Sequence, residues 1–149
     1  MIPEVVAVRR LLHCLQSTGT KDYYGQRVVT FIDIHQHSKR KSIFMYGPQY
    51  PIHHGSYQAV RVFPKIMSTV TQMFRFHSCR FRNEDYKENC ARMFIEREFG
   101  VTFSYCIECS QQAYIDKNRN IVDFDEQNLM DFGKSLAKSL CTFGALLDN

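Results

Sequence analysis

Two polar residues directly follow apolar, β-branched segments in the sequence. A catalytic or binding site would be built at such positions. His35 follows residues 28–34 (VVTFIDI), and Glu108 follows residues 101–107 (VTFSYCI). Imidazole is a common zinc ligand, and a carboxylate beside a metal can act as general base for its water. One His does not hold a catalytic zinc, which usually takes three protein ligands. The residues together therefore indicate part of a hydrolytic metal site, although either one alone is more often a capping or solvated residue.

A buried cation and a basic run add to this picture. Arg92 lies in the middle of an apolar helical stretch, and a buried Arg needs a carboxylate partner, which is either structural or part of a substrate. The basic run after His35 is typical of a solvated turn between two strands. The alternative is an electropositive rim that attracts an acidic substrate. The members of this run are His37, Lys39, Arg40 and Lys41.

Two further groups resemble metal ligands only superficially. Cys106 and Cys109 form a lone C-x-x-C, and a zinc knuckle would need a second pair at a comparable spacing. We therefore interpret them as cysteines at a strand end without a role in metal binding. His53 and His54 are adjacent in a loop, where neighbouring side chains usually point apart, and we do not expect them to bind a metal.

The segments that must position these residues alternate between helix and strand, which is typical of an α/β fold. Residues 28–34 are apolar on both faces as far as Asp33, which predicts a strand covered on both sides, in the centre of a sheet. Ligands of such sheets bind outside the carboxyl ends of the strands, where His35 and Glu108 would lie. The pattern predicts helices over 3–17, 60–73, 84–98 and 125–147, and strands over 28–34, 42–46 and 101–107, with polar loops over 17–25 and after Glu108 and no assignment for 76–82.

Length and composition restrict the function classes. The chain has 149 residues, of which 44% are hydrophobic and 23% charged, as in one globular domain or a piece of a larger one. A net charge of +4 is too small to predict nucleic-acid binding. No apolar stretch approaches the roughly 20 residues of a membrane helix, and the N-terminus has the wrong charge order for a secretory signal. Six irregularly spaced cysteines suggest reduced, mostly buried thiols and a cytoplasmic protein.

Three ordered segments resemble the cytosolic carboxypeptidases, a branch of the M14 zinc carboxypeptidases. Residues 31–47 (FIDIHQHSKRKSIFMYG) are similar to the pattern D-x-H-G-H-S-R-K-x-N-x-F-x-Y-G. Residues 60–68 (VRVFPKIMS) are similar to V-R-x-x-P-K-x-x-S. Residues 86–109 are similar to K-E-x-T-A-R-V-x-x-W-x-x-x-G-I followed by S-Y-T-x-E. The compatible spacing extends the resemblance over nearly the whole chain.

The resemblance implies a fold, a reaction and roles for three residues. The fold would be part of a mixed, mostly parallel sheet flanked by helices. His35 would be the third ligand of one zinc ion, and Glu108 would be the general base that passes a proton to the leaving amine. Arg92 would line the pocket that reads the terminal side chain, where it suits Glu. The implied partners are acidic protein C-terminal tails, such as the polyglutamate chains of tubulin.

Departures from the family pattern are equally informative. The sequence has no H-x-x-E, which supplies the family's first two zinc ligands, and neither N-P-D-G nor D-L-N-R. Gln36 replaces the Gly between the two histidines, and Cys-Ser-Gln-Gln follows Glu108. We therefore expect residues 1–149 to be the C-terminal part of an M14 catalytic domain. Without the N-terminal half, which would be its partner, this chain would be inactive alone.

Three functions remain open at this point. The first is a metallocarboxypeptidase with an incomplete sequence, which the presence of His35, Glu108 and Arg92 favours. The second is a non-catalytic pseudoenzyme that binds acidic protein tails without cutting them. The third is a small nucleic-acid-binding domain, which rests only on the net charge and the HSKRK run.

Overall fold

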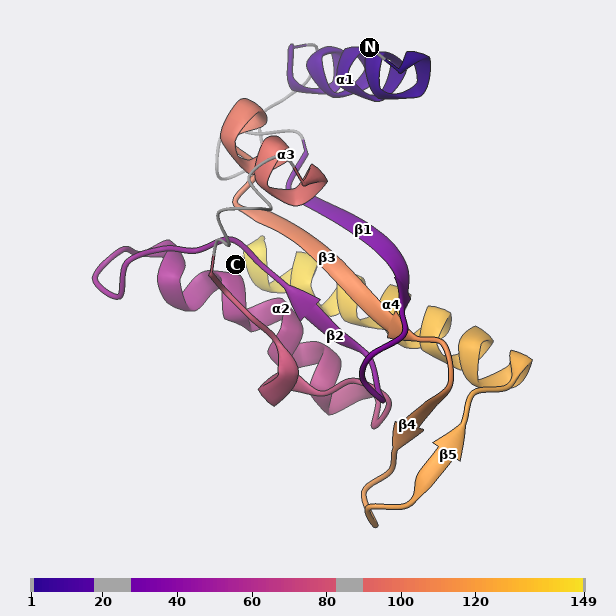
Figure 1. The fold of residues 1–149 in the computed structure, drawn as a ribbon. Helices are drawn as coiled ribbons and strands as arrows, with labels where there is room; N and C mark the ends of the chain where they lie inside the picture. Colours follow the sequence, from indigo (N-terminus) through magenta and orange to yellow (C-terminus); the bar gives the residue numbers. More distant parts are fainter. Residues whose placement is uncertain (1, 18–27, 83–89, 149) are drawn as a thin grey trace.

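The computed structural model describes residues 2–17, 28–82 and 90–148. Helices and strands alternate along the chain (Figure 1), and the first and last helices have the bounds expected from the sequence to within one residue. The elements are α1 (Pro3–Ser17), β1 (Thr30–His37), β2 (Phe44–Tyr46), α2 (Ser56–Val70), the 3-10 turn η1 (Phe76–Ser78), α3 (Ala91–Phe99), β3 (Phe103–Ser110), β4 (Ala113–Ile115), β5 (Ile121–Asp123) and α4 (Glu126–Leu147).

A three-stranded mixed sheet in the order β1-β3-β2 organises the fold, and this confirms the predicted α/β class. β1 and β3 are parallel, whereas β2 is antiparallel to β3. Helices α2 and α4 pack together on one face of the sheet (Figure 1). Alternate residues of β3 point into this layer, where Tyr105 lies 5.5 Å from the Phe63 ring and Phe103 lies 5.0 Å from the Phe143 ring, between centroids. The other residues of β3 face the opposite side of the sheet, near α3.

The prediction that residues 28–34 form a central strand is wrong for the described residues. β1 is an edge strand with β3 as its one neighbour, and Ile34 is 52% exposed. β3 occupies the centre, and it is buried along almost its whole length. Both strands also continue beyond the predicted ends, to His37 and Ser110. His35 and Glu108 therefore lie inside strands, on a face of the sheet, rather than in a crevice beyond the strand ends.

Most of the predicted helices are confirmed, with shifts at their ends. α1 has the predicted bounds, but α2 begins four residues early, at Ser56. Of the helix expected over 84–98, residues 83–89 lie outside the described residues, and α3 ends before Gly100, whose φ of 68° is left-handed. The start of α4 is capped by Asp125, whose side chain accepts a hydrogen bond from the backbone N–H of Asn128.

Some local structure differs from the sequence analysis. The loop expected after Glu108 contains a short hairpin, β4–β5, and most of the polar loop expected over 17–25 lies outside the described residues. The six cysteines carry free thiols, but the expectation that most are buried is wrong. Cys79 and Cys106 are buried, and Cys14 and Cys141 are exposed. None of the helices in the described residues combines the length and the apolar character needed to cross a membrane.

Candidate functional site

The register of the parallel pair β1–β3 brings four reactive side chains onto one face of the sheet. Asp33 lies opposite Cys106, and His35 lies opposite Glu108. Because side chains of a strand point to the same face at every second residue, these four residues share one side. Their side chains lie on the face of the sheet that points away from the α2–α4 layer. They are close to the sheet edge that β1 forms.

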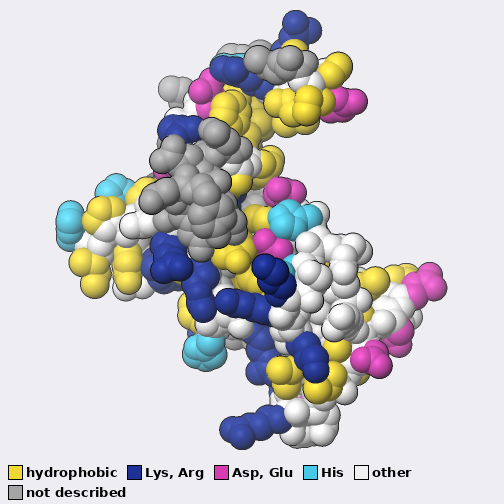
Figure 2. Space-filling model, in the orientation of Figure 1, with side chains coloured by type: hydrophobic (Ala, Val, Ile, Leu, Met, Phe, Trp, Pro, Cys, Tyr) yellow, Lys and Arg dark blue, Asp and Glu magenta, His cyan; other side chains and the backbone are white. Residues whose placement is uncertain are grey.

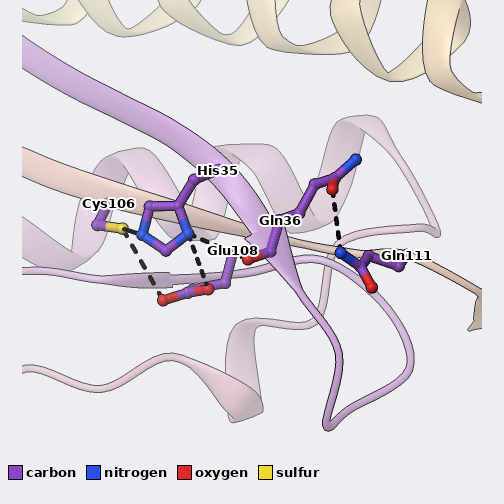
Figure 3. Close-up of polar contacts among 5 residues, drawn as sticks. All are labelled: His35, Gln36, Cys106, Glu108 and Gln111. Carbon is purple, nitrogen blue, oxygen red and sulfur yellow. Dashed lines mark hydrogen bonds and ion pairs between the residues drawn. The ribbon is translucent and has the colours of Figure 1, made fainter.

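His35 contacts a different group through each of its ring nitrogens (Figure 3). Nδ1 lies 3.4 Å from Glu108 Oε2 and 3.2 Å from the carbonyl oxygen of Gln36. Nε2 lies 3.0 Å from Cys106 Sγ. The His35 side chain is 49% exposed and that of Glu108 only 12%, so the imidazole forms the open side of this cluster.

Arg92 reaches the same cluster from the first turn of α3. The residue is 3% exposed, and its Nη1 donates a hydrogen bond to the carbonyl oxygen of Gly47 at 3.3 Å. Its guanidinium lies 5.8 Å from the centre of the Tyr46 ring. The expected carboxylate partner is not found within the described residues, where Arg92 forms no ion pair.

These residues line one cavity of about 250 Å³. The lining residues are Asp33, His35, Tyr46, Cys90, Ala91, Arg92, Cys106 and Glu108. The three residues selected from the sequence, His35, Glu108 and Arg92, thus come together, although they belong to three different elements.

Two carboxylates and one guanidinium line the cavity, and they act in opposite directions on its thiol. Burial, followed by the neighbouring carboxylates of Glu108 and Asp33, raises the pKa of the Cys106 thiol from 9.0 to about 12, against the effect of Arg92. A divalent cation would reverse this effect. The ligand atoms of Asp33, His35 and Cys106 lie within 4.8 Å of one another, and carboxylate, imidazole and thiolate are the ligands that zinc takes. The residues present therefore fit a zinc ion.

Other candidates from the sequence lie outside this cavity. His37 packs edge-on against the Phe44 ring, at 5.2 Å between centroids, and the guanidinium of Arg40 lies over the same ring. His54 stacks on Tyr50, at 4.8 Å. Cys109 stands three residues after Cys106, an odd separation, so it lies on the opposite face of β3.

Sequence reasoning missed Asp33 and Cys106 as members of the site. Each stands two residues before a residue that was selected, in Asp33-x-His35 and Cys106-x-Glu108. This period of two is the signal that would have found them, because it places both members of a pair on one face of a strand. Their meeting across the sheet depends on the register, which the sequence does not reveal.

Comparison with known proteins places these observations in a family. Cytosolic carboxypeptidase 4 of Mus musculus is 32% identical over 131 residues, which covers 75% of this chain and 11% of the relative. Cytosolic carboxypeptidase 1 of Danio rerio is 31% identical over 131 residues, with the same coverage. The chain is a homologue of the cytosolic carboxypeptidases. It spans about a tenth of the length of these relatives, and no protein-family model matches it.

Similarity to solved structures supports the fold of this carboxypeptidase homologue. The crystal structure of a metallo-carboxypeptidase from Burkholderia cenocepacia superposes with a TM-score of 0.68 and 18% sequence identity. The match covers 97% of this chain and 35% of the bacterial chain. The mixed sheet and its flanking helices therefore have the arrangement found in part of a metallo-carboxypeptidase.

Proposed function

We propose that this carboxypeptidase homologue forms part of the catalytic site of a zinc metallocarboxypeptidase, and that residues 1–149 are the C-terminal part of an M14 catalytic domain. The observation that carries the proposal is the β1–β3 register. It places the His35 imidazole 3.4 Å from the Glu108 carboxylate, in one cavity with the buried Arg92. A metallocarboxypeptidase needs these three kinds of group together: a metal ligand, a proton acceptor and a cation for substrate recognition.

His35 is the residue that holds the zinc ion in this proposal, together with ligands supplied by the H-x-x-E segment of the family pattern. When bound, the ion supplies Lewis-acid polarisation and lowers the pKa of a water molecule. Because the sequence lacks H-x-x-E, the chain alone is inactive in this proposal. It becomes active only in a product that also contains the missing segment.

Glu108 accepts the proton of the attacking water and donates it to the leaving amine. Its side chain is 12% exposed, so it is screened from bulk solvent but reaches the cavity. One carboxylate oxygen faces the His35 ring, which fixes the orientation of the group. A carboxylate held in this way is suited to general acid–base catalysis.

Arg92 selects acidic C-terminal residues. A guanidinium grips a carboxylate through two parallel hydrogen bonds, and burial strengthens this interaction because water does not compete. We therefore propose C-terminal Glu as the preferred residue and removal of Glu from acidic tails, such as those of tubulin, as the reaction. Lys and Arg side chains gather over β2 and the neighbouring part of the same face (Figure 2), which supports an acidic partner in the cytoplasm.

One contact favours the second candidate, a non-catalytic protein that binds acidic tails. Gln111 Nε2 donates a hydrogen bond to Gln36 Oε1 at 3.0 Å, next to the cluster (Figure 3). Gln36 stands where the family pattern has Gly, which has no side chain to form this bridge between the end of β1 and the segment after β3.

A peptidase assay distinguishes the two candidates. The complete transcript that encodes residues 1–149 is expressed, and its product is given a peptide with a free C-terminal Glu or the same peptide with a C-terminal amide. The proposal predicts release of Glu from the free peptide only, and loss of release after chelation of zinc. Arg92→Ala should lower kcat/KM for Glu-terminated peptides by about 10–100-fold more than for apolar ones, because a charged hydrogen bond is lost.

Arg97→Ala is the matched control, since Arg97 lies on the same helix and is exposed. It should leave both activities unchanged. Binding of the acidic peptide without release of Glu would support the non-catalytic candidate. Equal losses on acidic and apolar peptides in the Arg92 variant would remove this residue from the specificity pocket.

A further inference from the structure

We infer that the free edge of β1 and the apolar groove between α1, α3 and β1 form one docking surface, and that its occupant is the segment of the complete product that carries the family's H-x-x-E. This segment adds a strand to β1 and packs apolar side chains into the groove. The inference rests on the function proposed above. It goes beyond that function in stating where the missing part of the domain binds and which residues hold it.

β1 offers an unprotected edge to a further strand. It pairs with β3 over all eight of its residues, and among the described residues no strand pairs with its other side. Proteins usually protect such edges with Lys, Pro, a bulge or a short strand. β1 (TFIDIHQH) has no Lys, no Pro and no bulge, and its one acidic residue, Asp33, lines the site cavity. Ile34 is 52% exposed, so strand addition would also cover an apolar side chain.

The groove beside this edge is apolar and open. Its volume is about 520 Å³, and it lies between α1, α3 and the face of β1. Val5 and Val8 line the groove, and yet they are 51% and 49% exposed. The apolar lining consists of Val5, Val8, Leu12, Phe31, Phe94 and Ile95. Hydrophobic side chains are visible on the side of α1 that faces the sheet (Figure 2). An amphipathic helix with such a face needs an apolar partner.

The groove is continuous with the site cavity, because Asp33 and Ala91 line both. A segment that lies in the groove therefore reaches the cavity at Asp33, two residues before His35 on the same face of β1. His35 is the one zinc ligand that the proposed function takes from this chain, and its side chain is 49% exposed. The remaining ligands have to approach from the side that β3 does not occupy, and this side is the β1 edge.

The extent of the fold favours further chain of the same domain as the occupant. The bacterial metallo-carboxypeptidase with this arrangement matches 97% of the present chain with 35% of its own, so most of that structure lies outside the matched part. A second copy of the present chain also has a strand to pair with β1. However, it brings no H-x-x-E and leaves the zinc site incomplete.

Amide hydrogen exchange in the product of the complete transcript tests the edge. Alternate N–H groups of an edge strand point away from its neighbour and exchange as open amides, whereas those of a central strand are protected. We expect β1 to be protected as strongly as β3 in the complete product, and at least about 100-fold more strongly than in the 149-residue chain. The comparison of β1 with β3 within the complete product holds even if the 149-residue chain lacks helical circular dichroism.

Substitution in α1 tests the groove. Val8→Lys should lower the midpoint of thermal unfolding of the complete product by at least about 4 °C, because it places a charge among apolar groups. Leu11→Lys is the matched control, since Leu11 lies on the same helix with 57% exposure but does not line the groove. It should leave the midpoint unchanged. In the 149-residue chain, where the groove is open, both variants should match the unmodified chain.

The outcomes separate this inference from the proposed function. Rapid exchange of β1 in a complete product that releases Glu would overturn the docking surface and leave the proposed function intact. Protected β1 amides in a product that releases no Glu would support the docking surface and contradict the proposed function. Equal effects of Val8→Lys and Leu11→Lys would exclude the groove from the docking surface.

Two further results would also overturn the inference. A 149-residue chain that forms a dimer with protected β1 amides would assign the edge to a second copy. A complete transcript that encodes no further segment would contradict both the docking surface and the proposed function.

Discussion

Buried and half-buried thiols, together with one half-buried phenol, give individual residues an influence on the stability of the whole chain. Cys79 lies in the main core and accepts a hydrogen bond from the backbone N–H of Met45 at 3.3 Å. Burial raises the pKa of Cys79 from 9.0 to about 12. Burial also raises the pKa of Cys106 to about 12, that of Cys109 to about 11 and that of Tyr50 to about 12. All four groups are neutral in the folded chain at neutral pH.

These shifts predict that the chain loses stability in alkali. Above about pH 9 the unfolded chain releases thiol protons that the folded chain retains, so the free energy of unfolding falls as the pH rises from about 9 to about 12. Urea unfolding at about pH 8 and about pH 10.5 measures the difference. Cys79→Ala should show a shallower fall, whereas Cys14→Ala, at an exposed position, should match the unmodified chain. Equal stability at both pH values would contradict these pKa assignments.

At the scale of the element, close packing around the residue that follows β2 fixes the side of the cavity that Arg92 lines. Gly47 directly follows β2, and a Cβ atom there would lie 2.8 Å from Cδ1 of Phe81 and 3.3 Å from Cε1 of Tyr105. The carbonyl oxygen of the same residue accepts the hydrogen bond from Arg92. The packing of the Phe81 and Tyr105 rings therefore requires a glycine at this position. The carbonyl group of the same glycine also positions the guanidinium of Arg92.

Substitution of two glycines tests this packing. Gly47→Ala should destabilise the chain by about 1–3 kcal/mol, because neither ring can move without disturbing the core. Gly133→Ala is the matched control, since nothing lies within 4 Å of a Cβ at this position in α4. It should stabilise the chain by about 0.5–1 kcal/mol through helix propensity. Chemical denaturation of both variants measures these changes, and destabilisation of similar size in both would show that Gly47 has no special packing role.

Helices could be predicted where a local sequence pattern determines them. The order and register of the strands in the sheet could not be predicted. The apolar periodicity of α1 and the Asp125 cap of α4 are local signals, and the structure has both helices as expected. The position of β1 at the edge depends on which segments pair with it, and an apolar run looks alike in a central and an edge strand. For the same reason His35 and Glu108 were selected as strand-end residues, but their two partners, Asp33 and Cys106, emerged only from the register.

At the scale of the whole molecule, the described residues form two packed regions of unequal size. The main core lies between the sheet and the α2–α4 layer. A smaller cluster around Leu12, Ile95 and Val101 joins α1 to α3 (Figure 1). The candidate site lies between them, on the sheet face that α3 only partly covers. This position leaves the exposed side of His35 accessible to further ligands and to a peptide, as the proposed carboxypeptidase site requires.

The most direct test of the account is to measure bound zinc and turnover together in Glu108→Gln, made in the product of the complete transcript and held at saturating zinc. We predict that release of C-terminal Glu falls by about 100–10,000-fold, as expected for loss of a general base, while one zinc per molecule is retained. Loss of zinc together with turnover would show that Glu108 is a metal ligand. Turnover that remains unchanged would show that the β1–β3 cluster is not the catalytic centre.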